Sequence, residues 1–196
     1  MRPFTVHEGV AAPLDRADVD TDQIIPAVHL RRVERTGFGP FLFEAWRQDP
    51  SFVLNDPTFA DASVLVTGPN FGSGSSREHA VWALEDYGFR AVIAPSFADI
   101  FRSNCTKVGV LPVALTADEV RALLDLVTAT PGTRVTVDLE AREVRAEGFH
   151  ATFAIDDFTR WRLLEGLDDI GLTLRHADAI AAYEARRDPS LPRVTR

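Results

Sequence analysis

Residues 62–95 decide the fold and read ASVLVTGPNFGSGSSREHAVWALEDYGFRAVIAP. They begin with an apolar, β-branched run at 62–68, which is typical of a short buried strand. A loop punctuated by glycine follows at 70–74, and apolar residues then recur at helical spacing as far as Gly88, a natural helix stop. A second strand-like run occupies 89–95. A strand, a loop, a helix and a second strand in this order predict parallel β-sheet and an α/β fold.

The rest of the chain extends this pattern into one domain. The sequence Ser75-Ser76-Arg77-Glu78 has the form of a capping box and predicts that the helix begins at Ser75. Further elements are predicted as a helix from Ser96 to about Cys105 capped by Ser96, a strand at 109–113, a helix at 116–127 capped by Thr116, two or three antiparallel strands within 134–155, and surface helices at 157–166 and 176–187. Together they predict a mixed sheet flanked by helices.

Composition excludes several classes of protein. The 196 residues are 45% hydrophobic, which is enough for one substantial core. A net charge of −8 argues against a nucleic-acid-binding protein. No signal peptide and no apolar run of ~20 residues is present, so we expect a cytoplasmic protein that does not enter a membrane. We expect residues 1–187 to form the domain and the polar, proline-containing residues 188–196 to be a disordered tail.

The chain has a single cysteine, Cys105, which excludes an intrachain disulfide. One thiolate does not hold an iron–sulfur cluster, because such clusters need roughly three or four protein ligands. We expect Cys105 to be a small buried side chain on a helix and expect the chain itself to bind no metal or cofactor. Any cluster must come from another chain.

The loop at 72–77 is the clearest candidate for chemistry. Between a strand and a helix, backbone amides and the positive helix end converge on an anion. Neither a P-loop nor a nucleophile elbow is present, so a carboxylate is the favoured ligand. Ser75 and Ser76 offer hydroxyls and Arg77 offers a planar fork for a carboxylate. A serine acts as a base only where its alkoxide is stabilised, as this position allows. The alternative is that Ser75 is only a helix cap and Arg77 only a solvated side chain.

A resemblance adds to this interpretation. Residues 68–80, GPNFGSGSSREHA, resemble the signature of the swivel domain of the aconitase superfamily. The segments VDTDQIIP at 19–26, RTGFG at 35–39, SFADIF at 96–101 and LLEGLDDI at 163–170 agree with it in order and spacing. The resemblance covers nearly everything except the C-terminal tail. Within the superfamily, the chain resembles the small subunits of isopropylmalate isomerase.

The resemblance implies a swivelling β/β/α domain of the aconitase C-terminal type, carried as a separate small chain. Its partner would be a large subunit with a [4Fe-4S] cluster whose open iron binds the substrate hydroxyl and carboxylate. Carried over by position, Ser75 resembles the general base, and Ser76 and Arg77 resemble the residues that bind a substrate carboxylate. The implied reaction converts 2-isopropylmalate to 3-isopropylmalate by dehydration and rehydration in leucine biosynthesis.

Two further sites follow from the same resemblance. Thr21 and Asp22 match a pair at the rim of the active site, although both residue types also favour plain turns. Residues 27–32 match the segment that selects the variable group of the substrate, where Leu30 suits an isopropyl group and Arg31 suits a third carboxylate. A homoaconitase or methyl-substituted malate hydratase subunit, a non-catalytic carboxylate-binding domain and a purely structural subunit therefore remain as alternatives.

Three neighbouring polar residues are assigned no chemical role. His29 is expected to be a surface side chain without a role. His79 is expected to be structural, and the capping-box position of Glu78 explains that residue without any catalytic function.

Overall fold

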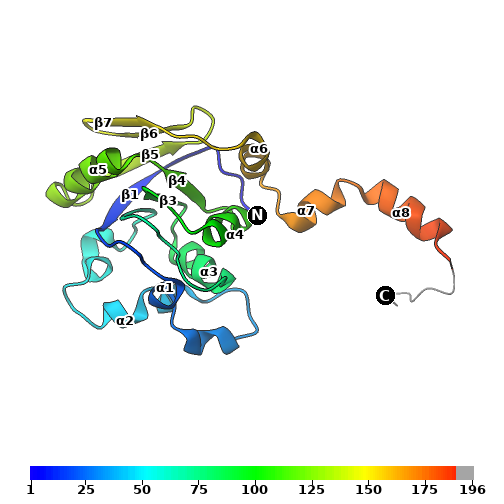
Figure 1. Ribbon diagram of the computed structural model, residues 1–196, viewed down its shortest axis with the longest axis horizontal. Coiled ribbons are helices and arrows are strands. Elements are labelled where there is room, and N and C mark those ends of the chain that lie inside the picture. The colour runs from blue at the N-terminus through cyan, green and yellow to red at the C-terminus, as the bar shows by residue number, and fades with distance from the viewer. Residues whose placement is uncertain (189–196) are drawn as a thin grey trace.

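The computed structural model describes residues 1–188, and seven strands form one mixed sheet in the order β4-β3-β2-β1-β5-β6-β7 (Figure 1). The strands are β1 (Val6–Leu14), β2 (Val64–Thr67), β3 (Ala91–Ala94), β4 (Leu111–Ala114), β5 (Arg134–Asp138), β6 (Glu143–Ala146) and β7 (Phe149–Thr152). β1 to β4 run parallel, whereas β5 to β7 form an antiparallel meander attached to the other edge of β1. The predicted α/β class, the mixed sheet and the antiparallel strands within 134–155 are confirmed.

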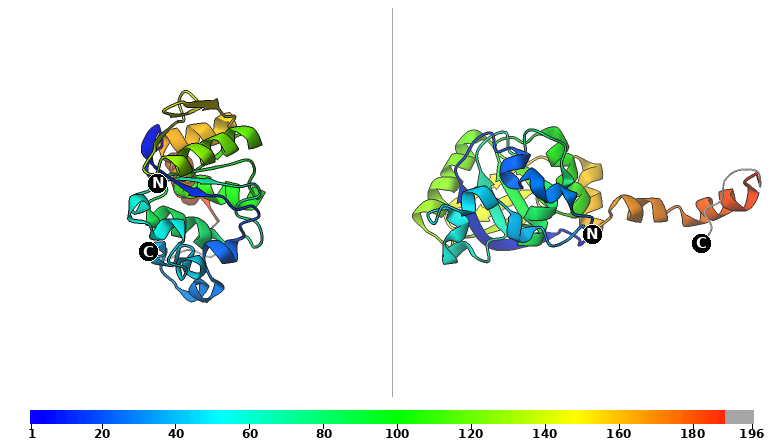
Figure 2. Two further views of the ribbon diagram at one scale, coloured as in Figure 1. Left: turned by 90° about the vertical axis from the view of Figure 1, so that its left-hand side faces the viewer. Right: turned by 90° about the horizontal axis from the view of Figure 1, so that it is seen from below.

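Helices cover both faces of the parallel strands (Figures 1 and 2). The α-helices are α1 (Thr21–Ile24), α2 (Glu44–Arg47), α3 (Glu78–Tyr87), α4 (Asp99–Val108), α5 (Ala117–Ala129), α6 (Asp157–Glu165), α7 (Asp169–Leu174) and α8 (Ala177–Arg186). Short 3-10 turns are η1 (Ala27–Arg31), η2 (Gly39–Phe41), η3 (Val53–Asn55) and η4 (Pro57–Phe59). One apolar core lies between the sheet and α1, α3 and α4, and a second lies around α5, where the meander closes over it.

Alternating side chains of the parallel strands build these two cores. Leu65 and Val92 face α3 and α4, whereas Val64, Val66 and Ile93 face α5. Because side chains of successive strand residues point to opposite faces, a strand covered on both sides must be apolar throughout. The uniformly apolar runs in the sequence are therefore explained by helices on both faces.

Only one of the predicted helix caps forms. Thr116 and Glu119 make the expected capping box at the start of α5, whose buried face is the predicted one. The predicted cap at Ser75 is wrong, because α3 begins at Glu78, and the predicted cap at Ser96 is wrong, because α4 begins at Asp99. The Ser96 hydroxyl instead accepts a hydrogen bond of 2.9 Å from the amide of Asn70. Contacts between loops take precedence here over local capping.

The C-terminal part leaves the body of the domain. α7 and α8 extend away from it as an arm, as Figure 1 and the right-hand view of Figure 2 show. The predicted helix at 176–187 is present as α8, whereas α7 was not predicted. No helix within residues 1–188 is long and apolar enough to cross a membrane. The tail predicted to be disordered lies, except for Asp188, outside the described residues.

Candidate active site

Three loops meet at the carboxyl edge of the parallel strands. They follow β1, β2 and β3, and the carboxyl ends of parallel strands share one edge of a sheet, where ligands bind in open α/β sheets. The amide of Gly72 donates to the carbonyl of Val19 at 2.8 Å, and the amide of Phe71 donates to the carbonyl of Ser96 at 3.1 Å. Main-chain hydrogen bonds therefore hold the loop after β2 between the loop after β1 and the loop after β3.

Two glycines give this loop its path. Gly72 has φ +79° and Gly74 has φ +88°, both in the left-handed region that favours glycine. A Cβ on Gly72 would lie 2.1 Å from Cγ of Phe101, whereas one on Gly74 would meet nothing closer than 3.5 Å. Gly72 is thus needed for close packing on α4, and Gly74 mainly for its backbone angle.

Ser75 and Ser76 are exposed at the end of this loop, immediately before α3. Neither hydroxyl is hydrogen-bonded to another residue within 1–188, and the amides of Gly74, Ser75 and Ser76 donate to none of these residues either. The main chain is nevertheless fixed, because the Ser75 carbonyl accepts from the amide of Arg77 at 2.8 Å. The loop presents two hydroxyls and three free amide donors on a backbone held by hydrogen bonds, which suits an anionic ligand.

Thr21 and Asp22 lie directly beside this loop. The Thr21 side chain is buried, and its hydroxyl donates to the Ser75 carbonyl at 3.2 Å. Asp22 forms an ion pair with Arg77, whose side chain is 20% exposed. The structure therefore brings four of the predicted site residues into contact with one another: Thr21, Asp22, Ser75 and Arg77.

The sequence interpretation overlooked Asp20, which positions that pair. Its carboxylate accepts from the amide of Gln23 at 2.8 Å, and the Gln23 side chain accepts in return from the Asp20 amide at 2.9 Å. This reciprocal capping box fixes the single turn α1 on which Thr21 and Asp22 stand. An Asp followed three residues later by Gln was the signal that could have identified it.

Leu30 and Arg31 lie on the 3-10 turn η1, apart from the other site residues. Leu30 is half-buried and Arg31 is exposed. Within residues 1–188, neither makes a hydrogen bond or ion pair with the loop at 72–77. The structure therefore does not bring Leu30 and Arg31 into polar contact with Ser75, Ser76 or Arg77.

His29 is not the free surface residue that we expected. Its ring stacks on Phe41 with centroids 3.9 Å apart, and its Nε2 lies 2.6 Å from a carboxylate oxygen of Glu44. The side chain is 15% exposed. Because the partners come from residues 12 and 15 positions later, His29 ties η1 to the body of the domain. Glu44 was not identified from the sequence, since nothing in its local pattern marks it.

The remaining polar residues near the loop are structural in character. His79 packs edge-on against Phe38, with centroids 5.3 Å apart, and against Trp82. Burial lowers the pKa of His79, with Arg77 acting in the same direction and Glu78 opposing it. The capping-box role expected of Glu78 is wrong, because α3 begins at Glu78 itself, its cap position is Arg77, and no side chain caps it. Cys105 is fully buried, and that burial raises the pKa of its thiol, as expected for an inert side chain.

Comparison with known families accounts for almost the whole chain. Residues 1–118 match the aconitase C-terminal domain family, residues 121–157 match a family described as LeuD_N, and residues 169–195 match the C-terminal domain of the 3-isopropylmalate dehydratase small subunit. The 3-isopropylmalate dehydratase small subunit of Acidothermus cellulolyticus is 67% identical over 187 residues, which is 95% of each chain. The chain belongs to the 3-isopropylmalate dehydratase small subunits.

Other members of the family agree. The small subunit from Parafrankia sp. is 65% identical over 192 residues, covering 98% of both chains. A crystal structure of 3-isopropylmalate dehydratase from Methanocaldococcus jannaschii is 28% identical, with a TM-score of 0.69, over 92% of this chain and 99% of that one. The resemblance to the aconitase swivel domain is therefore confirmed in sequence and fold. The chain is the small subunit of a heteromeric hydro-lyase of leucine biosynthesis.

Proposed function

We propose that this chain supplies the general base and the carboxylate-binding loop for the isomerisation of 2-isopropylmalate to 3-isopropylmalate, at a cytoplasmic site completed by the large subunit. The observation that carries the proposal is the cluster of Ser75, Arg77, Thr21 and Asp22 at the carboxyl edge of the sheet. Family membership gives the reaction class, and this geometry supports the roles of the individual residues.

The loop is suited to hold a substrate carboxylate. The guanidinium of Arg77 has five N–H donors, so its contact with Asp22 leaves others for a ligand. That contact also fixes the direction of the guanidinium, and the Ser76 hydroxyl and the free amides of residues 74–76 add neutral donors. A carboxylate bound by these groups would place its neighbouring carbon next to Ser75.

Ser75 is the proposed base because its hydroxyl is free and its backbone is fixed. In the dehydration step, Ser75 Oγ takes the proton from the substrate carbon, the C–O bond to the leaving hydroxyl breaks, and a C=C bond forms. In the hydration step the two positions are exchanged: Ser75 Oγ gives its proton to the carbon that lost the hydroxyl, and hydroxide adds to the carbon that lost the proton. Free amides and the nearby Arg77 would stabilise the alkoxide, provided that the docked large subunit excludes water from the loop.

The leaving hydroxyl needs an electrophile that this chain does not supply. Its single cysteine is fully buried, and no group of residues within 1–188 has the arrangement of a metal site, so its side chains do not fit an iron–sulfur cluster. We therefore assign the [4Fe-4S] cluster to the large subunit. The contribution of this chain is proton transfer and binding of the carboxylate.

The substituent of the substrate is assigned to η1. The half-buried Leu30 supports an isopropyl group, whereas the exposed Arg31 would favour a third carboxylate only if it turned toward the ligand. We therefore prefer isopropylmalate to the substrates of a homoaconitase or of a methyl-substituted malate hydratase.

Substitution of Ser75 by alanine tests the proposal. The chain is mixed with an anaerobically reconstituted large subunit, and the absorbance of the unsaturated intermediate is followed with 2-isopropylmalate and with other substituted malates. We expect Ser75→Ala to lower kcat by about 10²–10⁴-fold, the usual contribution of a general base, without weakening assembly.

Ser73→Ala is the matched control. Ser73 lies in the same loop, but its hydroxyl makes only a long, 3.5 Å contact with the carbonyl of Asp18. This variant should keep its turnover. Normal turnover by Ser75→Ala would refute the assignment of the base. Turnover of a different malate by the wild-type mixture would instead move the substrate assignment to the alternatives.

A further inference from the structure

We propose that α7 and α8 form an arm that docks onto the large subunit and contributes much of the affinity between the two chains. This inference rests on the proposed function, because that function requires a large subunit over the Ser75 loop. The arm is defined as residues 169–186, and every residue from Thr173 to Arg186 is exposed. The arm is also the part of the chain that matches a family of its own, at 169–195, separate from the aconitase domain match.

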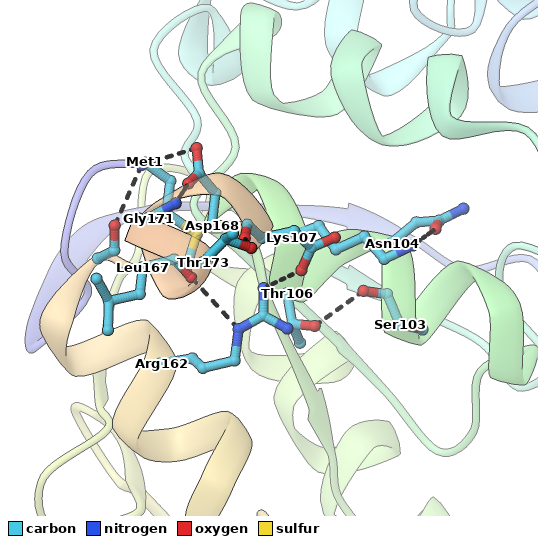
Figure 3. Close-up of polar contacts among 12 residues, drawn as sticks. Met1, Ser103, Asn104, Thr106, Lys107, Arg162, Leu167, Asp168, Gly171 and Thr173 are labelled. Carbon is cyan, nitrogen blue, oxygen red and sulfur yellow. Dashed lines mark hydrogen bonds and ion pairs between the residues drawn. The ribbon is translucent and has the colours of Figure 1, made fainter. Parts of the chain in front are cut away.

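The base of the arm is firmly attached to the body of the domain (Figure 3). Asp168 caps α7 by accepting from the amide of Gly171 at 2.7 Å. Arg162, only 12% exposed, binds a carboxylate oxygen of Asp169 at 2.7 Å and the carbonyl of Leu167 at 3.3 Å. Gly166 packs so closely that a Cβ there would lie 2.8 Å from the carbonyl oxygen of Met1. The direction in which the arm leaves the domain is therefore set by specific contacts.

The arm itself carries exposed apolar side chains. Ile170 and Leu174 are 67% and 61% exposed, and four-residue spacing places them on one face of α7. Tyr183 on α8 is 53% exposed. α8 has 10 residues and no buried one, and an isolated helix of that length is marginal in water. A helix of this kind is normally stabilised by packing against another surface. Within residues 1–188, α8 has no buried side chain and so packs against no such surface.

The position of the arm identifies the large subunit as the occupant. A hollow of about 440 Å³ is lined on one side by Glu78 and Trp82 of α3 and on the other by Asp168 and Ile170 at the base of the arm. Glu78 follows Arg77 directly in the chain, so the hollow begins next to the active-site loop and ends at the arm. A partner that covers Ser75 and continues along α3 toward the arm would also cover the hollow. A second copy of this chain seated on that surface would instead obstruct the loop.

The length of the arm suits this role. Its two helices contain 6 and 10 residues, which corresponds to roughly 24 Å of helix. Stable interfaces bury about 800 Å² on each partner, and a loop of six residues presents only a small part of that area. The arm adds an apolar extension whose contacts are remote from the chemistry. Such contacts affect assembly and leave the reacting groups unchanged.

The test compares Leu174→Glu with Val6→Glu in the full chain. Both replace an exposed apolar residue by an acid, but Val6 lies on β1, outside the arm, and is 48% exposed. The dissociation constant for the large subunit is measured by titration, together with kcat at saturating large subunit. We expect Leu174→Glu to weaken binding at least tenfold with kcat unchanged at saturation, and Val6→Glu to bind within twofold of wild type.

A second arm variant, Ile170→Glu, guards against a local effect of one substitution and should weaken binding similarly. Unchanged affinity in both arm variants, with unchanged thermal unfolding, would overturn the inference. Loss of self-association of the isolated chain without loss of large-subunit affinity would also overturn it, by assigning the arm to a second copy. If the wild-type complex assembles but turns over no substrate, the proposed function fails, and the affinities still decide the role of the arm.

Discussion

The loop at 72–77 and the turn η1 at 27–31 carry most of the proposed substrate contacts, yet they are held in place in different ways. The loop is fixed by main-chain hydrogen bonds to the neighbouring loops and by glycines at positive φ. η1 is fixed by the side chain of His29, which reaches Glu44 and Phe41. The shape of the loop therefore depends on its main chain and its glycines, whereas the position of η1 depends on side-chain contacts.

This difference separates chemistry from selectivity. A base must stay at a fixed distance from the substrate carbon, and a main-chain framework provides that precision. A segment that distinguishes substituents can change its shape by substitution of one residue without disturbing the base. We infer that related substrates can be accommodated through residues 27–31 while the loop at 72–77 stays as it is.

The largest effect is expected from Gly72→Ala. The new methyl group would lie 2.1 Å from Phe101, and the residue would keep a positive φ. Crowding and backbone strain together should lower the free energy of unfolding by about 3–5 kcal/mol, as measured by urea denaturation. Gly74→Ala is the control, because space is available there, and should cost only about 1–2 kcal/mol from its backbone angle. Equal effects would mean that packing against Phe101 does not hold the loop.

The sequence predicted the framework of this loop better than its details. Apolar runs at 62–68 and 89–95 identified the parallel strands, since strands covered on both faces must be apolar throughout. The caps predicted at Ser75 and Ser96 are wrong because a capping pattern considers only hydrogen bonds within a few residues of the chain and ignores contacts with distant segments. In the folded chain Ser96 instead binds Asn70, 26 residues away, and the carbonyl of Ser75 accepts from Thr21, 54 residues away.

Other elements left no local signal at all. β1 has polar and apolar residues in no clear alternation, because its early part pairs with the meander and its later part with β2. The contact of His29 with Glu44 joins two short turns, and the sequence of neither turn predicts the other. The loop at 72–77 was identified from its position and residue types, whereas the roles of its residues and the sites at 21–22 and 27–32 came from the resemblance. The structure adds which of these residues touch.

A smaller effect is expected from His29→Ala. Loss of a partly buried hydrogen bond costs about 1 kcal/mol, so KM for isopropylmalate should rise about fivefold as η1 loosens, with kcat nearly unchanged. Steady-state kinetics with excess large subunit measure both constants. Glu44→Gln keeps an acceptor for the His29 ring and should show a weaker effect. A fall in kcat at constant KM would contradict the separation of chemistry from selectivity.

The smallest effect concerns His79, which lies in the first turn of α3, two residues after the loop, and packs against Phe38. Burial lowers its pKa below the ordinary value of 6.5, so the unfolded chain binds a proton more readily than the folded one in the range just below that value. The stability of the wild type should therefore fall as the pH decreases through 6.5 toward the lowered pKa, and this penalty is absent at higher pH.

His79→Phe isolates this contribution, because it keeps an aromatic ring but does not titrate. Its unfolding free energy should depend less on pH in that range. His7, whose pKa is also lowered by burial, remains in both proteins and cancels in the comparison. The difference should be small, because solvent screens a side chain that is only partly buried. Both proteins are unfolded with urea between about pH 7 and pH 5, the range in which histidine titrates. An equal pH dependence of their unfolding free energies would mean that His79 does not contribute to it.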